Sequence, residues 1–276
     1  MRTATVIGWP ISHSRSPLIH GYWLKRYGIE GAYERRPVNP EELAAFVGSI
    51  RRGELAGSNV TVPHKEAVLK LVDDADAIAT AIGAANTLWG ENGRVRATNT
   101  DAHGFLANLQ AAFPDWQSAP GAPFVIGAGG AARAIIYALK GAGCERIRLT
   151  NRSPERAREL AAYFGPAVEV VDWQERAARL GDVSLLVNTT TQGMAGQPPL
   201  GLPLAALPKA AIVYDLIYVP LRTPLMMDAE ARGLASLGGL GMLLHQAGVG
   251  FEHWFGRRPE VTEELFKLVA ADIEGH

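Results

Sequence analysis

Cysteine is nearly missing from this sequence. Of 276 residues only Cys144 is a cysteine, so the chain cannot form an internal disulfide. Such low cysteine content is typical of proteins from a reducing compartment. The lone thiol, which follows Gly143, is interpreted as small filler of a hydrophobic core.

Strong charge and long apolar runs are missing as well. The formal net charge is −1 and no run of Lys or Arg is longer than a pair, which argues against a nucleic-acid partner. No apolar run approaches the roughly 18 residues of a membrane span. The first residues form a strand-like segment and do not resemble a signal peptide. We expect a soluble, cytoplasmic protein with neither nucleic acid nor membrane as partner.

The motifs of two large enzyme classes are also absent. The seven histidines form neither an H-E-x-x-H motif nor a Cys/His pair with ligand spacing, so no metal site is expected. No Gly-x-Ser-x-Gly elbow occurs, which argues against a serine hydrolase. The length suits one large domain or two modest ones, and either can bury a core.

The strongest positive signal is the segment F-V-I-G-A-G-G-A-A-R-A-I-I-Y-A-L at residues 124–139. It reads as a strand, a glycine turn and an apolar helix, the order of a nucleotide-binding βαβ unit. Gly127 allows the tight turn, Gly129 lets the backbone approach a pyrophosphate, and Ala132 stands where a third glycine is usual. Amides at the start of the helix would face the anion. A tight turn without a ligand is the alternative.

The next predicted strand, 147–150, indicates which dinucleotide such a turn would bind. NAD sites place a carboxylate about 20 residues after the turn, where it binds the ribose hydroxyl. Here Asn151 and Arg152 occupy that place, and Arg156 follows one helical turn later. A guanidinium suits a phosphate, so this pattern predicts NADP(H). Solvated surface arginines are the alternative.

Strand-like and helix-like segments alternate along the whole chain. Strands are expected at 3–7, 32–38, 57–62, 147–150, 168–171, 184–188 and 211–216, and a hairpin joins 86–89 to 94–99. Helices are expected at 17–27, 40–53, 64–72, 74–82, 101–113, 154–164, 224–232 and from 241 onward. This alternation predicts an α/β protein with a doubly wound parallel sheet. The proline-rich loop 114–123 separates two α/β units.

Polar clusters lie where strands of the first unit end, which is where open α/β sheets bind ligands. Ser14 and Ser16 can hold a carboxylate, although helix capping would also explain them. Asn59 and Thr61 share one strand face. Lys65 falls in the first turn of the next helix, where the helix dipole disfavours a cation unless something else is gained. A solvated surface lysine is the alternative.

Two further polar positions, Asp101 in the first unit and Gln246 on a helix that must meet one of the two units, are candidate site residues. Asp101, in the segment T-N-T-D, either caps its helix or pairs with Lys65 and positions it for proton transfer. Gln246, on the C-terminal helical segment, is either a hydrogen-bonding ligand or an exposed helix residue. The residues alone leave both choices open.

Taken in order, the motifs resemble those of the shikimate dehydrogenase family. They are S-H-S-R-S-P, N-V-T-V-P-H-K, A-A-N-T, T-N-T-D, G-A-G-G-A-A-R, N-R-S, Y-D-L-I-Y-V-P and G-L-G-M-L-L-H-Q-A. The resemblance implies a substrate domain at 1–101, completed by helices at 240–276, and a Rossmann-like NADP domain at 102–239. It places the active site in a cleft between the two domains.

The resemblance also implies the site residues. Ser14 and Ser16 would bind the carboxylate of shikimate, and Thr61, Lys65, Asn86, Asp101 and Gln246 its hydroxyls, with Tyr218 nearby. Lys65 would transfer the proton, with Asp101 beside it. The cofactor would lie against Gly127, Ala128, Gly129, Gly130, Ala131, Asn151, Arg152, Ser153, Arg156, Thr189, Leu216 and Gly239.

The implied activity is the reversible, NADPH-dependent reduction of 3-dehydroshikimate to shikimate. This step belongs to the shikimate pathway of aromatic amino-acid and chorismate biosynthesis. One alternative is a quinate/shikimate dehydrogenase that uses NAD, against which Arg152 argues. Another is a shikimate- or nucleotide-binding protein without turnover, against which Lys65 and Asp101 together argue. Whether the protein forms a homodimer is left open.

Overall fold

The computed structural model describes residues 1–275. His276, the last residue of the predicted C-terminal segment, lies outside the described residues. The chain divides into two compact units. The first consists of Met1–Gly104 with Leu243–Ala271, and the second of Phe105–Met242 with the residues that follow Ala271. The first unit is therefore built from two separate segments of the chain, and the second consists of the segment between them and the few residues after Ala271.

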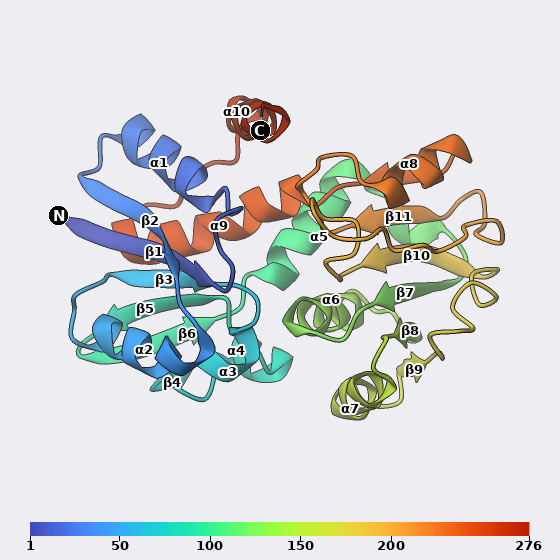
Figure 1. Cartoon of the computed structure of the whole chain (residues 1–276), viewed down its shortest axis with the longest axis horizontal. Coiled ribbons are helices and arrows are strands. Elements are labelled where there is room, and N and C mark those ends of the chain that lie inside the picture. Colours follow the sequence, from blue (N-terminus) through green and yellow to red (C-terminus); the bar gives the residue numbers. More distant parts are fainter. Residues whose placement is uncertain (276) are drawn as a thin grey trace. The chain divides into compact units, whose positions relative to one another are not determined.

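The first unit contains a mixed six-stranded sheet in the order β2-β1-β3-β5-β6-β4 (Figure 1). Its strands are β1 (Arg2–Gly8), β2 (Gly31–Pro37), β3 (Gly57–Val60), β4 (Asp74–Ala75), β5 (Thr87–Glu91) and β6 (Arg94–Thr98). β1 runs parallel to both β2 and β3, whereas β5 and β6 form the antiparallel hairpin predicted from the sequence. The turn residues Asn92 and Gly93 both have positive φ, as a tight hairpin turn requires.

Helices cover both faces of this sheet. They are α1 (Ser16–Tyr27), α2 (Leu43–Arg51), α3 (Lys65–Val68), α4 (Ala77–Ile82), α9 (Leu240–Phe255) and α10 (Glu263–Glu274). α2 buries Leu43, Phe46, Val47 and Ile50, which recur at helical spacing and pack into the core against the sheet. On the other face lie α1 and α9 (Figure 1). They contribute an aromatic cluster that includes Trp23, Phe251 and Trp254.

The second unit contains the parallel, doubly wound sheet expected from the alternating pattern. Its strand order is β12-β11-β10-β7-β8-β9, and every pair is parallel. The strands are β7 (Ala122–Ile126), β8 (Ile147–Thr150), β9 (Val168–Val170), β10 (Val183–Asn188), β11 (Ile212–Asp215) and β12 (Ala235–Leu237). The helices are α6 (Gly130–Gly141), α7 (Pro154–Phe164) and α8 (Pro224–Ala231). α5 (Asp101–Ala112) begins in the first unit and belongs to the second from Phe105 onward.

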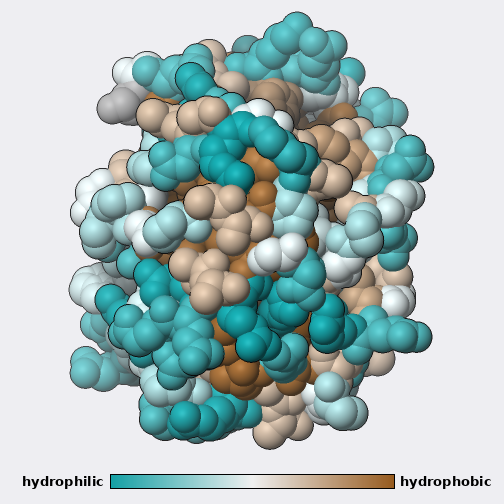
Figure 2. Space-filling view, turned by 90° about the vertical axis from the view of Figure 1, so that its right-hand side faces the viewer, coloured by the Kyte–Doolittle hydropathy of each residue, from teal (hydrophilic) through white to brown (hydrophobic). Residues whose placement is uncertain are grey.

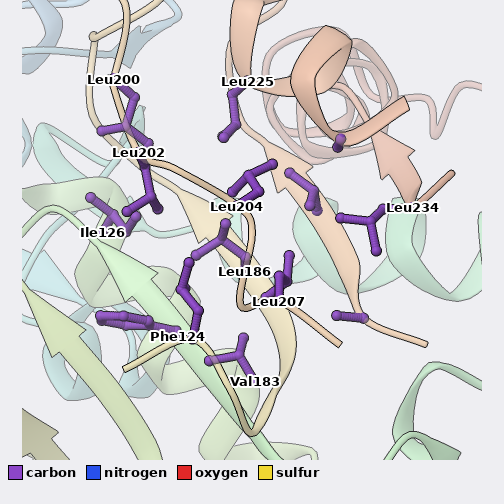
Figure 3. Close-up of a cluster of buried hydrophobic side chains, with 14 of the residues drawn as sticks. Phe124, Ile126, Val183, Leu186, Leu200, Leu202, Leu204, Leu207, Leu225 and Leu234 are labelled. Carbon is purple, nitrogen blue, oxygen red and sulfur yellow. The ribbon is translucent and has the colours of Figure 1, made fainter. Parts of the chain in front are cut away.

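A leucine-rich segment without regular structure covers part of this second sheet. Leu200, Leu202 and Leu204 alternate along it, and all three pack onto Phe124, Ile126 and other buried side chains of β7 and β10 (Figure 3). Each Å² of apolar surface that this packing removes from water stabilises the unit by about 25 cal/mol. On the side that faces the viewer in Figure 2, apolar surface is visible only between polar side chains.

Some local expectations were wrong. Asp74 does not begin a helix, because Asp74–Ala75 pairs with β6 and Asp76 then caps α4. Residues 122–123 belong to a strand instead of the preceding loop, since they pair with β10. Cys144 is partly exposed in the turn after α6, so it is no core residue.

Candidate active site

Lys65 and Asp101 meet in the first unit. Lys65 is the first residue of α3, in the segment that follows β3, and Asp101 is the first residue of α5, just after β6. The Lys65 Nζ atom lies 2.5 Å from Asp101 Oδ2, with 13% of the lysine side chain and 6% of the aspartate side chain exposed. A charge pair this dehydrated needs further hydrogen bonds to be stable.

Asn86 supplies one of those bonds. Its Nδ2 donates to Asp101 Oδ1 at 2.8 Å, and its Oδ1 accepts from the Thr100 amide at 2.9 Å. Gln246 of α9 lies beside them, because its Oε1 accepts from Asn86 Nδ2 at 3.3 Å and from Thr100 Oγ1 at 3.2 Å. Lys65, Asn86, Asp101 and Gln246 therefore form one connected cluster of ionic and amide groups.

Of the two predicted serines, Ser14 lies in the loop before α1, and Ser16 is the first residue of that helix. Ser14 and Ser16 are buried, and the Ser14 hydroxyl donates to Ser16 Oγ at 3.2 Å. Arg35 Nε donates to the Ser14 carbonyl at 2.7 Å, which anchors the loop to β2. Thr61 follows β3 and is partly exposed.

Polar residues that the sequence reasoning left without a role link these two groups of side chains. The Tyr33 hydroxyl donates to Asn59 Oδ1 at 2.6 Å, and Asn59 Nδ2 donates to Thr87 Oγ1 at 3.2 Å. Burial raises the pKa of Tyr33 well above its usual range, and the Ser16 side chain opposes this shift as a hydrogen-bond partner. The available signal was the presence of Asn59 and Thr87 in short strands, where their nearest neighbours along the strand are apolar or small.

The glycine turn lies at the carboxyl end of β7 in the second unit. Gly127 has φ +112, and a Cβ there would lie 2.4 Å from Thr189 Oγ1, so only glycine fits. Gly129 precedes α6, and a Cβ there would meet nothing within 4 Å. The intrahelical bonds start with Arg133 N–H to Gly129 O, which leaves the amides of residues 130–132 for a ligand.

The predicted adenosine-phosphate residues follow β8, the neighbour of β7. Asn151 Nδ2 donates to the Ser153 carbonyl at 2.9 Å and thereby folds the turn into α7. Arg152, Ser153 and Arg156 are exposed. The turn at 151–153 thus presents the Arg152 guanidinium and no carboxylate, as a site for a 2′-phosphate requires. The first turn of α7 adds the Arg156 guanidinium and the exposed carboxylate of Glu155.

The remaining predicted cofactor residues follow β10, β11 and β12. The Thr189 hydroxyl donates to the Ile126 carbonyl at 2.8 Å, beside the glycine turn. Leu216 donates its amide to the Asn188 carbonyl at 3.0 Å, and a Cβ on Gly239 would lie 2.0 Å from the Leu216 carbonyl oxygen. Thr189, Leu216 and Gly239 therefore line adjacent strand ends. Tyr218 is partly exposed in the loop after β11.

A buried carboxyl group holds that loop. Asp215 is fully buried, accepting from Thr223 Oγ1 at 2.7 Å, Asn188 Nδ2 at 3.0 Å and the Ile217 amide at 3.2 Å. Burial raises the pKa of Asp215 to about 6, although these three donors oppose the shift. No sequence signal marked Asp215 apart from its place in Y-D-L-I-Y-V-P.

Within residues 1–275, no three His, Cys, Asp or Glu side chains are grouped so that they could hold a metal ion. No helix in this part of the chain is long and apolar enough to cross a membrane.

A Rossmann-like sheet with a glycine turn in one unit and a buried Lys–Asp pair in the other α/β unit of the same chain define a two-unit dehydrogenase architecture. Three family models match the chain. Residues 6–88 match the shikimate dehydrogenase substrate binding domain, 108–194 match shikimate / quinate 5-dehydrogenase, and 239–263 match the shikimate 5′-dehydrogenase C-terminal domain. The chain belongs to the shikimate dehydrogenase family.

Individual relatives agree with this assignment. The shikimate dehydrogenase (NADP(+)) of Paramagnetospirillum magneticum is 55% identical over 97% of this chain and 98% of its own length. The Thermus thermophilus shikimate 5-dehydrogenase, solved in complex with NADP(H) and shikimate, is 36% identical, with a TM-score of 0.85 over 99% of this chain and 100% of that one. The Corynebacterium glutamicum quinate dehydrogenase, in complex with NAD, is 26% identical, with a TM-score of 0.87 over 100% and 99%.

Proposed function

We propose that this protein catalyses the reversible, NADPH-dependent reduction of 3-dehydroshikimate to shikimate, a step in aromatic amino-acid biosynthesis. The observation that carries the proposal is the buried Lys65–Asp101 pair, joined to Asn86 and Gln246 in a member of the shikimate dehydrogenase family. The NADP-named relatives and the Thermus complex with NADP(H) and shikimate support the choice of cofactor and substrate.

Lys65 is the proton-transfer residue in this proposal. As the ring ketone is reduced, negative charge grows on its oxygen, and an ammonium group at hydrogen-bond distance stabilises that charge and gives the proton. In the oxidative direction the neutral amine takes the proton back. Asp101 orients Lys65, because its carboxylate is itself fixed by Asn86. The bonds on both sides of Asp101 restrict the amine to one geometry.

The substrate is held by polar groups of the first unit. Ser14 and Ser16 bind its carboxylate through their hydroxyls, and Thr61, Asn86, Asp101 and Gln246 bind ring hydroxyls. Tyr218, from the second unit, lies near the substrate in the working enzyme. In this proposal 1–101 with 240–276 is the substrate domain and 102–239 is the NADP domain.

The residues of the second unit fit a dinucleotide phosphate, which supplies or accepts the hydride when it is bound. The turn from Gly127 to Ala131 holds the pyrophosphate on the free amides of α6. Asn151, Arg152, Ser153 and Arg156 hold the adenosine phosphate, and Thr189, Leu216 and Gly239 border the rest of the cofactor. Arg152 stands where an NAD site has a carboxylate, which favours NADP over the NAD bound to the quinate dehydrogenase.

The direct test is a spectrophotometric assay of NADP⁺ reduction by shikimate. We expect turnover by the wild-type protein and by Lys70→Ala, which removes an exposed lysine five residues from Lys65. Lys65→Ala should lose most of the rate. Wild-type protein that binds both ligands without turnover would instead identify a binding protein. Faster turnover of quinate with NAD⁺ would identify the quinate-type alternative.

Two properties complete the proposal. We place the enzyme in the cytoplasm, where the single cysteine stays reduced. A homodimer is its candidate assembly, and light scattering of the purified protein distinguishes it from a monomer.

A further inference from the structure

An unbroken chain of buried hydrogen bonds leads through the first unit to the Lys65–Asp101 pair. It starts at the Tyr33 hydroxyl on β2 and passes to Asn59 on β3 at 2.6 Å and to Thr87 on β5 at 3.2 Å. Thr87 Oγ1 then donates to Asn86 Oδ1 at 2.9 Å, and Asn86 Nδ2 donates to Asp101 at 2.8 Å. Every member of the chain is less than 9% exposed.

The sheet register places Tyr33, Asn59 and Thr87 on one face. Tyr33 pairs with Ala4 of β1, and Asn59 pairs with Val6, two residues further along the same strand. Residues two apart on a strand point to the same side, and Asn59 in turn pairs directly with Thr87. Ala4 is small, so the Tyr33 side chain can extend across β1 to reach Asn59.

The chemistry of the groups fixes the direction of donation. An ionised Asp101 can only accept, so Asn86 must offer its Nδ2 and keep its Oδ1 for donors. Thr87 then donates its single proton to that oxygen and accepts from Asn59 Nδ2. Asn59 is left with an oxygen that needs a donor, and Tyr33 provides it. Reversal of any amide would set two donors or two acceptors against each other.

Tyr33 itself is held in place. Its ring stacks on His20 with centroids 3.9 Å apart and an interplanar angle of 9°. The hydrogen-bond chain is not the only restraint on Asn86, since the Thr100 amide also donates to Asn86 Oδ1 at 2.9 Å. Loss of the chain should therefore weaken the orientation of Asn86 without abolishing it.

We infer that Tyr33 and Thr87 are positioning residues, which act through Asn59 and Asn86 to hold Asp101, and through it Lys65, in the geometry for proton transfer. The inference rests on the proposed function. Tyr33 and Thr87 fix the amide orientations that the site needs. Their effect on the reaction therefore depends on Lys65.

The test compares kcat for shikimate oxidation among matched variants. Tyr33→Phe and Thr87→Val remove one hydroxyl each at nearly constant volume, and Thr87→Ser keeps the hydroxyl. We expect a loss of about tenfold in kcat for Tyr33→Phe and for Thr87→Val, the scale of one hydrogen bond, and a near wild-type rate for Thr87→Ser. KM for NADP⁺ should not change.

Two combinations separate positioning from general damage. The double variant Tyr33→Phe/Thr87→Val should lose no more than either single variant, since both interrupt one chain. In a Lys65→Ala background, Tyr33→Phe should cost nothing further. Full additivity in either combination, or unchanged kcat in Thr87→Val, would overturn the inference while leaving the proposed function intact. A wild-type protein without shikimate turnover would overturn both.

Discussion

His20 should make the first unit sensitive to acid. This histidine on α1 is fully buried among Trp23, Tyr33, Phe251 and Trp254, and among residues 1–275 neither ring nitrogen has a hydrogen-bond partner. Burial lowers the pKa of His20 from 6.5 to about 3, and the nearby Asn59 side chain offsets this only in part. The folded protein therefore keeps the imidazole neutral where the unfolded chain would protonate it.

The size of the effect follows from the two pKa values. A folded pKa below the unfolded one gives stability that is present above pH 6.5 and is lost as the pH falls toward 3. The fall of the His20 pKa from 6.5 to about 3 corresponds to about 5 kcal/mol of stability, since each pH unit between the two pKa values contributes about 1.36 kcal/mol. Between neutral pH and pH 5 the loss should be about 2 kcal/mol, a large part of a typical stability of about 5–15 kcal/mol.

The perturbation is His20→Phe, which keeps an aromatic ring in the cluster and removes the titration. Urea unfolding at pH 7.5 and at pH 5, followed by circular dichroism, gives the free energy of unfolding of both proteins. Hydrogen exchange of β1 and α1 peptides assigns the change to the first unit. The packing cost of phenylalanine is the same at both pH values, so the variant should gain about 2 kcal/mol relative to wild type at pH 5. An equal difference at both pH values would refute the reasoning.

Three further predictions concern single side chains. Asp215→Asn should gain up to about 3 kcal/mol in free energy of unfolding relative to wild type as the pH rises from 4 to 6. The reason is that the pKa of the buried wild-type carboxyl is raised to about 6, so its ionisation over this range destabilises the wild-type fold. A difference between the two proteins that does not change with pH in urea unfolding would contradict this. Lys65→Ala should lower kcat by roughly 10²- to 10⁴-fold, the scale of a general acid, in the shikimate assay; a near wild-type rate would remove Lys65 from the mechanism. Arg152→Asp should weaken NADPH binding far more than NADH binding in fluorescence titrations, with Arg158→Asp as a neighbouring control; equal losses for both cofactors would count against a phosphate contact.

The sequence predicted most of the second unit because its signals are local. The glycine turn after β7, the proline and glycine that bound α7, and the apolar strands all act within a few residues. β12 was missed because its three half-buried residues carry no alternation, and only pairing with β11 makes them a strand. β4 was taken for a helix start for the same reason, since Asp74 pairs with Arg96 of β6, 22 residues further along the chain.

The site was harder to predict than the fold. Lys65 drew attention because a lysine at a helix start needs a reason, but its contact with Asp101 spans 36 residues of chain. Tyr33 and Thr87 look ordinary in β-strands, where aromatic and β-branched residues are common. Their place in one hydrogen-bond chain depends on the strand order β2-β1-β3-β5, which no local pattern contains.

The split construction of the first unit has a consequence for biosynthesis. Trp254 of α9 packs so tightly over Gly57 that a Cβ on this glycine would lie 2.1 Å from its indole nitrogen. All strands of the second sheet are consecutive in the chain and are therefore synthesised one after another. Domains generally fold as units during synthesis. Residues 1–104, by contrast, are completed only by α9, which follows the second sheet in the chain. A premature stop codon between the end of β12 and residue 243 would therefore spare the second sheet and leave the lysine-bearing unit incomplete.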